Sequence, residues 1–232
     1  MNKNLTIPVA IVVAGVVIAI AVYLTGNSGI QTTNNTSQQN TKTNSDVTVR
    51  PVTADEHILG NPNAQIKIID YSDTECPYCK QYHQTIKEIY SAYTTSGEVA
   101  WVYRDFPLPI HTKAENESEA LECAADLGGN TKFWKYLDEI FSITPSNDGL
   151  DPAQLPIIAK DVGLNVTDFN SCLSSGKEAI KVKADYQDAI NAGASGAPYT
   201  VFVTPKGNIA NTDGAIPYDA VENYIKIIQS NL

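Results

Sequence analysis

The chain has 232 residues, a formal net charge of -10 at pH 7 and 43% hydrophobic residues. This length accommodates one mid-sized domain with an appended segment, and the apolar fraction is that of an ordinary globular protein. The acidic balance argues against binding to nucleic acid and against broad adhesion to an anionic membrane surface, because both reward basic surfaces. Its simplest role is to aid solubility.

The N-terminus predicts a membrane anchor. Residues 5–24 form an uncharged, largely apolar stretch of 20 residues, about the length that crosses a bilayer core as a helix. Lys3 precedes this stretch, so the N-terminus is expected to stay cytoplasmic. A cleaved signal peptide is the alternative, but its apolar region is normally shorter and the sequence around Thr25 fits a cleavage site poorly. We therefore expect an uncleaved transmembrane signal-anchor over residues 1–24.

A polar linker follows the predicted anchor. Between Thr25 and Asp46, 19 of the 22 residues are Ser, Thr, Asn, Gln or Gly. Such a segment cannot bury enough apolar surface to fold. We expect a disordered linker over residues 25–50 with a reach of roughly 25 Å, which carries a folded domain over residues 51–232 outside the cytoplasm.

The first half of the folded part reads as a βαβ unit. Residues 47–63 are a turn-rich approach with no predicted element, and the apolar run 66–71 predicts a buried strand. Apolar and aromatic residues at helical spacing predict a helix over residues 77–93. Residues 98–105 predict a second strand, which lies parallel to the first because a helix joins the two.

The second half begins with helices and ends with strands. Helices are predicted over residues 113–127, 133–141, 151–162, 167–173 and 174–192. The β-prone run 199–204 predicts a strand, and a turn at 205–208 leads to a short partner at 209–212. An amphipathic helix over 218–228 closes the chain. The predicted fold is α/β, in the order βαβ, a helical insertion over about residues 107–194, then ββα.

The motif Cys76-Pro77-Tyr78-Cys79 stands where the first predicted strand gives way to the first predicted helix. Unpaired backbone N–H groups and the positive end of the helix dipole favour a thiolate at this position. Pro77 suits the first helical turn, where its missing N–H costs nothing. We predict that Cys76 is the exposed attacking thiolate and that Cys79, one turn further on, closes a disulfide with it.

A bare CxxC motif is also half of a zinc site. The chain has no second CxxC and three His, none spaced as a ligand pair. His83 stands four residues after Cys79 on the same predicted helix and could join the two cysteines, but a closed structural site needs four ligands. A metal-binding module therefore remains an alternative. For the favoured redox pair, no metal or organic cofactor is expected.

The order of these elements, with a CxxC motif at the start of the first helix, resembles the thioredoxin fold with a helical insertion. The match is closer still to the DsbA-like thiol:disulfide oxidoreductases of that superfamily, over about residues 52–232. Several segments resemble the family in register: 57–62, 69–73, 104–108 with His111, 132–134 and 193–198. The resemblance implies a thioredoxin-like fold and thiol–disulfide exchange, which needs no cofactor.

The resemblance also implies roles for residues outside the motif. The family has a cis peptide bond at the position of Pro198, which would leave the backbone of Ala197 free to pair with an extended substrate strand. An ordinary strand-initiating proline is the alternative. The family often has Thr or Val where this chain has Ala197, so substrate and redox preference are expected to differ.

Two further residues bear on the chemistry of the pair. Asp70, six residues before Cys76, matches a buried acid of the family that exchanges a proton with Cys79; a solvated acid at the end of a strand is the alternative. Tyr78 stands where the strongly oxidising members have His and offers no positive charge to a thiolate. We therefore expect a less oxidising pair than theirs.

Cys123 and Cys172 both fall in the predicted helical insertion. An exported domain lies in an oxidising compartment, where structural disulfides persist. We predict that these two residues form one. Two buried free cysteines are the alternative, since Cys is a common small apolar core residue.

The sequence thus predicts a thiol:disulfide oxidoreductase anchored in the cell membrane, with its catalytic domain outside the cytoplasm. The expected partners are exported proteins with Cys thiols and, as the resemblance implies, a membrane redox partner of the DsbB or VKOR type. A disulfide isomerase or reductase of the same fold is the alternative within the class. A metal-binding module and a peptide-binding holdase with an idle redox site are the alternatives outside it.

Overall fold

The computed structural model describes residues 47–232 of the chain, except for the side chains of Asn208 and Ile209. The predicted anchor over residues 1–24 and most of the predicted linker lie outside the described residues. Within residues 47–232, every helix is too short or too polar to cross a membrane.

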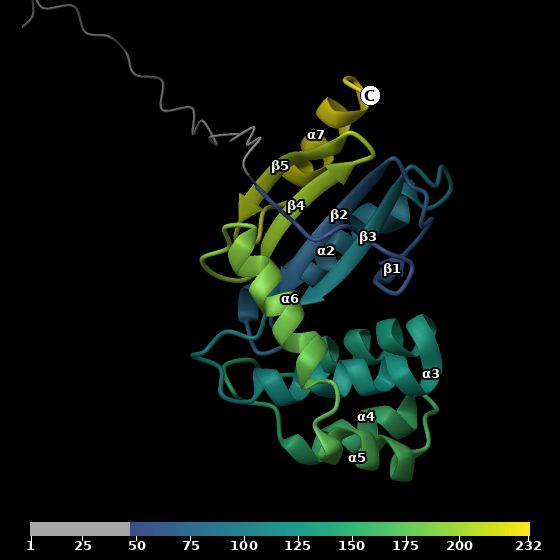
Figure 1. Ribbon diagram of the computed structural model, residues 1–232, viewed down its shortest axis with the longest axis vertical. Coiled ribbons are helices and arrows are strands. Elements are labelled where there is room, and N and C mark those ends of the chain that lie inside the picture. Colours follow the sequence, from purple (N-terminus) through teal and green to yellow (C-terminus); the bar gives the residue numbers. More distant parts are fainter. Residues whose placement is uncertain (1–46) are drawn as a thin grey trace, which may run out of the picture. The chain divides into compact units, whose positions relative to one another are not determined.

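Five strands form one mixed sheet in the order β1-β3-β2-β4-β5 (Figure 1). The central strands β2 (Ile66–Ser72) and β3 (Val99–Asp105) are parallel and are joined by helix α2 (Pro77–Tyr93). Strand β4 (Tyr199–Thr204) pairs antiparallel with β2, and β5 (Gly207–Asp213) pairs antiparallel with β4. The predicted βαβ and ββα units are confirmed.

The edge strand β1 (His57–Leu59) was not expected, because residues 47–63 were interpreted as turns. It pairs antiparallel with β3. Three residues are too few to show a period-2 pattern, so the strand is defined by its partner and not by its own sequence. Gly60 ends it with a φ of 108°, where an added Cβ would lie 3.0 Å from the Tyr90 ring.

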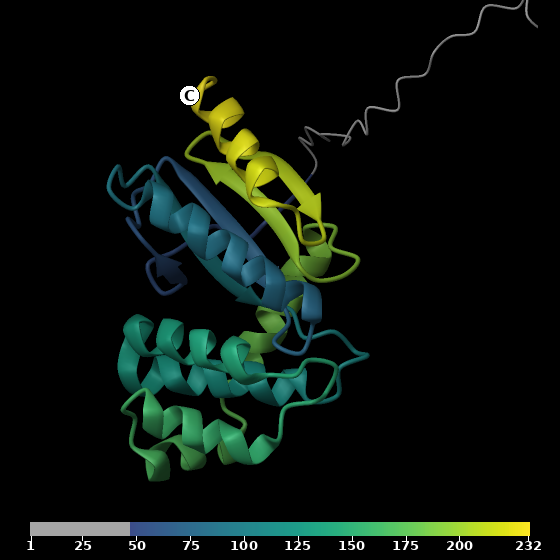
Figure 2. The ribbon, with the colours of Figure 1, turned by 180° about the vertical axis from the view of Figure 1, so that it is seen from behind.

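The helical insertion starts with α3 (Ala114–Ile143), which Gly129 interrupts with a φ of 69° and a ψ of -174°. The two halves lie side by side in Figures 1 and 2 and correspond to the two helices predicted on either side of this glycine. A short turn η1 (Pro152–Gln154) precedes α4 (Leu155–Asp161) and α5 (Val166–Ser175). Gly176, with a φ of 62°, ends α5.

The last helix of the insertion is α6 (Ala179–Asn191). It starts five residues later than the sequence pattern predicted, because α5 runs on to Ser175 and the left-handed Gly176 must follow before a new helix can begin.

Helices cover both faces of the sheet. Figure 2 shows α2 and α7 (Tyr218–Gln229) side by side on one face. On the other face, Ala189 and Ala192 at the end of α6 pack on Ile69 and Val201 of the sheet. The extended segment 47–52 adds valines to this second cluster, namely Val47, Val49 and Val52. The sheet is therefore buried on both sides.

Arg104 of β3 fixes α6 on the sheet. Its fully buried guanidinium donates to Glu56 Oε2 at 3.0 Å and to Asp188 Oδ2 of α6 at 2.5 Å. Arg50 extends the cluster by donating to Asp185 Oδ1 at 2.6 Å. A buried guanidinium with several acceptors is well suited to hold such acids in place. Since α6 leads directly into residues 192–198, the ion cluster also positions the loop before β4.

Candidate active site

Cys76 is the N-cap residue of α2, and Pro77 occupies the first helical turn. The sequence predicted both placements. Cys76 is less accessible than expected, since 4% of it is exposed, while Cys79 is fully buried. Tyr78, between them, is 65% exposed. An incoming sulfur atom therefore meets Cys76 first and Tyr78 beside it.

The two thiols are tuned in opposite directions. A hydrogen bond from Cys79 and the backbone N–H groups of Cys79 and Tyr78 lower the pKa of Cys76 to about 6, against burial and the nearby Asp73 carboxylate. Burial, followed by the bond to Cys76, raises the pKa of Cys79 well above its usual value. At neutral pH the lowered pKa favours the thiolate of Cys76, and the raised pKa favours the thiol of Cys79, so Cys76 is the more nucleophilic of the two sulfur atoms.

The loop before β4 faces the motif. The Ala197–Pro198 peptide bond is cis, and the Sγ atom of Cys76 lies 3.5 Å from the carbonyl oxygen of Ala197. The structure thus brings both of these residues to the nucleophile from the far end of the chain.

Asp70 lies inside the protein, on β2. It is 1% exposed, pairs in register with Tyr103 on β3 and Thr200 on β4, and its Oδ1 has no hydrogen-bond partner. Burial raises the pKa of Asp70 to about 8. Burial, followed by the charges of Asp105, Asp70 and Cys79, raises the pKa of Tyr103. The acid is therefore protonated at neutral pH and belongs to the same buried region as Cys79.

Asp73 is fully buried and organises the loop before Cys76. Its Oδ1 accepts from the N–H of Glu75 at 2.7 Å. Its Oδ2 accepts from the N–H of Leu108 at 2.7 Å and pairs with His111 Nδ1 at 2.9 Å. Its reach to residues 108–111 is tertiary and left no local pattern.

Two buried acids beside the motif, Glu75 and Glu117, have structural roles that the sequence does not predict. Glu75 accepts from the N–H groups of Gly149 and Leu150 at 3.2 and 3.1 Å. Glu117, at the start of α3, accepts from Thr74 Oγ1 at 2.6 Å. The position of Glu75 directly before Cys76 is the one sequence signal for such a role, and it indicates only a nearby charge.

The histidine of the alternative metal site is engaged elsewhere. His83 Nε2 is 2.8 Å from Asp138 Oδ1, and its ring packs against Trp101 and Phe141. Burial lowers the pKa of His83. In residues 47–232, the groups of acidic, His and Cys side chains that lie close enough to hold an ion include neither Cys76 nor Cys79.

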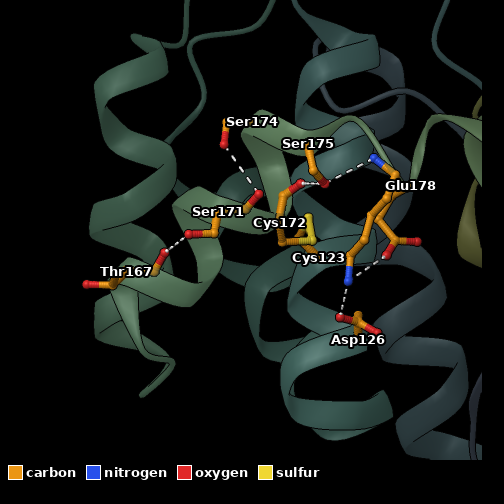
Figure 3. Close-up of a disulfide and its surroundings, with 9 residues drawn as sticks. Cys123, Asp126, Thr167, Ser171, Cys172, Ser174, Ser175 and Glu178 are labelled. Carbon is orange, nitrogen blue, oxygen red and sulfur yellow. Dashed lines mark hydrogen bonds and ion pairs between the residues drawn. A yellow bond between two sulfur atoms is a disulfide. The ribbon is translucent and has the colours of Figure 1, made fainter.

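Cys123 and Cys172 form a disulfide that joins α3 to α5, with their Cα atoms 5.9 Å apart (Figure 3). Both residues are buried. Beside them, Lys177 pairs with Asp126 at 2.6 Å on the surface. The bond lies within the helical insertion, so it braces the insertion and takes no part in the Cys76 site.

Comparison with curated proteins finds similarity to parts of longer chains. The Na(+)/H(+) antiporter NhaA 3 of Salinispora tropica is 33% identical over 155 residues, which cover 66% of this chain and 22% of that protein. NhaA 1 of Salinispora arenicola is 31% identical with the same coverage. The chain thus spans about a fifth of the length of these relatives.

Two solved structures match over nearly their full length. DsbA2 of Pseudomonas aeruginosa has a TM-score of 0.68 and 24% identity, covering 79% of this chain and 99% of that one. BdbD of Bacillus subtilis in its oxidised form has a TM-score of 0.65 and 20% identity, covering 79% and 97%. At these identities the likeness shows the fold.

Residues 52–226 match the family model described as Thioredoxin. This match covers most of the chain, and it agrees with the βαβ–ββα order, the inserted helices and the CxxC motif at the start of α2. The chain therefore belongs to the thioredoxin family and has the DsbA-like form of its fold.

Proposed function

We propose that this protein is a thiol:disulfide oxidoreductase that exchanges disulfides with exported proteins through Cys76 and Cys79. The observation that carries the proposal is the position of the two cysteines at the N-terminus of α2, with Cys76 as the N-cap and Cys79 buried behind it, where their pKa values shift in opposite directions. A related fold, α-DsbA2 of Wolbachia pipientis, is described as a thiol-disulfide exchange protein. That description supports the proposal.

In the oxidising direction the reaction has two steps. A substrate thiolate attacks Cys76 Sγ of the Cys76–Cys79 disulfide, the S–S bond breaks, and Cys79 leaves as a thiolate that takes up a proton. A second substrate thiolate then attacks the substrate sulfur of the mixed disulfide and releases Cys76 as a thiolate. The substrate loses two electrons and the enzyme becomes a dithiol. The low pKa of Cys76 favours its departure in this second step.

Two residues assist in this scheme. Asp70 is protonated at neutral pH and serves as the proton donor to the Cys79 thiolate, and as the acceptor in the reverse direction. Ala197 offers its backbone to an extended substrate segment, which would add as a strand beside the loop before β4. The 3.5 Å separation between Cys76 Sγ and the Ala197 carbonyl oxygen supports this role, because a segment bound at Ala197 would lie next to the nucleophile.

The direction of exchange follows from the stability of the Cys76 thiolate. Its pKa of about 6 lies between the values of about 7 for thioredoxin and about 3.5 for DsbA. Tyr78 adds no cation to the site. We therefore favour an intermediate redox potential, with isomerase or reductase activity as the second candidate.

The cellular setting is part of the proposal. The apolar stretch 5–24 would anchor the protein in the cell membrane with the folded domain outside the cytoplasm. A membrane redox partner of the DsbB or VKOR type would reoxidise the dithiol. The sequence pattern supports the anchor, and the DsbA-like fold supports the kind of partner.

The test is the equilibrium reduction potential of the Cys76/Cys79 pair in the purified protein against glutathione buffers, with Cys123 and Cys172 followed separately by mass. A value near -180 to -230 mV, the range of protein disulfide isomerase and glutaredoxins, is expected. A value near about -120 mV would make the protein a strong dithiol oxidase and contradict the argument from Tyr78. Absence of reversible exchange, with activity unchanged in Cys76→Ser, would reject the oxidoreductase.

A further inference from the structure

The loop that follows α3 is held in a conformation that L-residues rarely adopt. Three consecutive non-glycine residues, Ser146, Asn147 and Asp148, have φ values of 67°, 55° and 61°. Side chains crowd the backbone in this left-handed region, so such a run persists only where its surroundings enforce it. We refer to residues 144–150 as the left-handed loop.

Glu75 holds the left-handed loop through three hydrogen bonds. Its carbonyl oxygen accepts from the N–H of Asn147 at 2.7 Å. Its carboxylate accepts from the N–H of Gly149 at 3.2 Å and of Leu150 at 3.1 Å. The side chain is fully buried, and Cys76 is the next residue. One residue therefore ties the left-handed loop to the nucleophile through three backbone N–H groups.

Lysines complete the attachment from two other elements. Lys80, in the first turns of α2, donates from Nζ to the carbonyl oxygen of Thr144 at 2.6 Å. Lys113, before α3, donates from Nζ to the carbonyl oxygen of Leu150 at 2.7 Å. Both ammonium groups are directed at backbone oxygens of the loop and not at the Glu75 carboxylate.

Glu117 adds a second carboxyl group to Glu75. It is 2% exposed, accepts from Thr74 Oγ1 at 2.6 Å, and is hydrogen-bonded through its side chain to Glu75. Two carboxyl groups can share a hydrogen bond only when one of them carries a proton. Burial, then the bond to Glu75, raises the pKa of Glu117 to about 9. Glu117 is therefore the protonated partner.

The surroundings offer this pair little positive charge. The groups with the largest effects on Glu117 are Glu75, Thr74 and Asp73 of the active-site loop, and none of them is a cation. On the side of α3, burial and then the charge of Glu117 raise the pKa of Tyr136. Loss of the shared proton would leave two adjacent carboxylates without a counter-ion among these groups.

We propose that Glu75 and Glu117 form a proton-sharing carboxyl pair that holds the left-handed loop against the active-site loop, and that Glu75 is thereby a positioning residue for Cys76. The positioning role rests on the proposed function, whereas the carboxyl pair itself does not. Loss of the Glu117 proton to solvent base would set two carboxylates against each other and free the N–H groups of Gly149 and Leu150.

Hydrogen exchange at the Gly149 and Leu150 amides of the full chain, from pH 7 to 10.5, tests the pair. Below pH 8 both amides of the wild type should be protected. Above pH 8 their protection factors, which already correct for the intrinsic exchange rate, should fall at least tenfold, with a midpoint near pH 9. Glu117→Gln keeps a donor toward Glu75 and an acceptor for Thr74, so protection should persist without a midpoint. The proposed carboxyl pair would be wrong if amide exchange in the wild type followed the intrinsic rate alone, or if the Glu117→Gln variant showed the same midpoint.

The positioning role is tested through Cys76. Glu75→Gln presents one oxygen to two N–H groups, so it should alter the rate of Cys76 alkylation at pH 7 at least threefold and shift the reduction potential of the pair. The exposed Glu115→Gln, from the same turn of α3, should match the wild type. Unchanged reactivity and potential in a folded Glu75→Gln would refute the role. If the wild type itself exchanged no disulfides, the proposed function would fail, and the amide measurement would still decide the pair.

Discussion

The Sγ atom of Cys76 lies 3.5 Å from the carbonyl oxygen of Ala197, although 121 positions separate the two residues. The helix start at Cys76 and the loop before β4 meet because β2, which leads to the motif, pairs with β4, which follows Pro198. The nucleophile and the backbone proposed to bind substrate therefore stand at adjacent strand ends of one sheet.

The pKa of Cys76 should be measurable directly. The thiolate absorbance near 240 nm of the reduced protein should rise with a midpoint at about pH 6. Cys79→Ala removes the largest stabilising contact and should move this midpoint up by ~1 unit or more. Cys76→Ser should lack the transition. A wild-type midpoint above pH 8 would contradict the tuning described for the site.

Asp70→Asn should make the protein more stable at alkaline pH. Burial raises the pKa of Asp70 from 3.8 to about 8, so between these values the folded state holds a proton that the unfolded state has lost. Stability therefore falls as pH rises through this window. At pH 8 the variant should gain on the order of 2–4 kcal/mol, and at pH 4 almost nothing. Urea denaturation at both pH values checks this, with the exposed Asp55→Asn as control; an equal effect at both would be inconsistent with the titration.

Much of the fold could be predicted because its signals are local. The apolar run of β2, the helical spacing of α2 and the β-prone residues of β4 are contiguous patterns, and the motif falls where strand and helix meet. These patterns fix the βαβ and ββα units and the position of Cys76. They do not depend on distant parts of the chain.

What could not be predicted depends on partners far along the chain. β1 is a strand because it pairs with β3. Asp73 organises the active-site loop because its carboxylate binds Leu108 and His111. The local sequence around Glu75 and Glu117 is that of exposed acids, whereas both residues are buried in the folded protein. A charged residue usually lies in solvent, so sequence alone favours the wrong environment for such groups.

Arg104→Met should be strongly destabilising. The substitution leaves Glu56 and Asp188 without their shared guanidinium in a buried setting, and breaking a buried ion pair in this way costs about 3–5 kcal/mol. Replacing the acids as well, in Arg104→Met/Glu56→Gln/Asp188→Asn, should recover part of the loss. Chemical denaturation provides the comparison. Equal stability of the single variant and the wild type would show that the cluster adds nothing.

Removal of the Cys123–Cys172 disulfide should lower stability without changing the active site. The bond spans a separation of 49 residues, for which the chain-entropy model gives about 4 kcal/mol. Cys123→Ala/Cys172→Ala should therefore unfold at lower denaturant concentration, while the midpoint of the Cys76 thiolate stays unchanged. A shifted Cys76 midpoint would mean that the disulfide influences the nucleophile through the insertion.

The sheet order has a consequence for how the protein is made. β2 lies between β3, which follows it closely in the chain, and β4, which lies beyond the whole insertion. Synthesis from the N-terminus therefore yields Cys76, Cys79 and Cys123 before Cys172 and before the strand that completes the reactive site. A nascent chain carries three thiols, and one of them still has no native partner. A non-native disulfide formed at this stage would have to be exchanged for the Cys123–Cys172 bond before the protein reaches its active form.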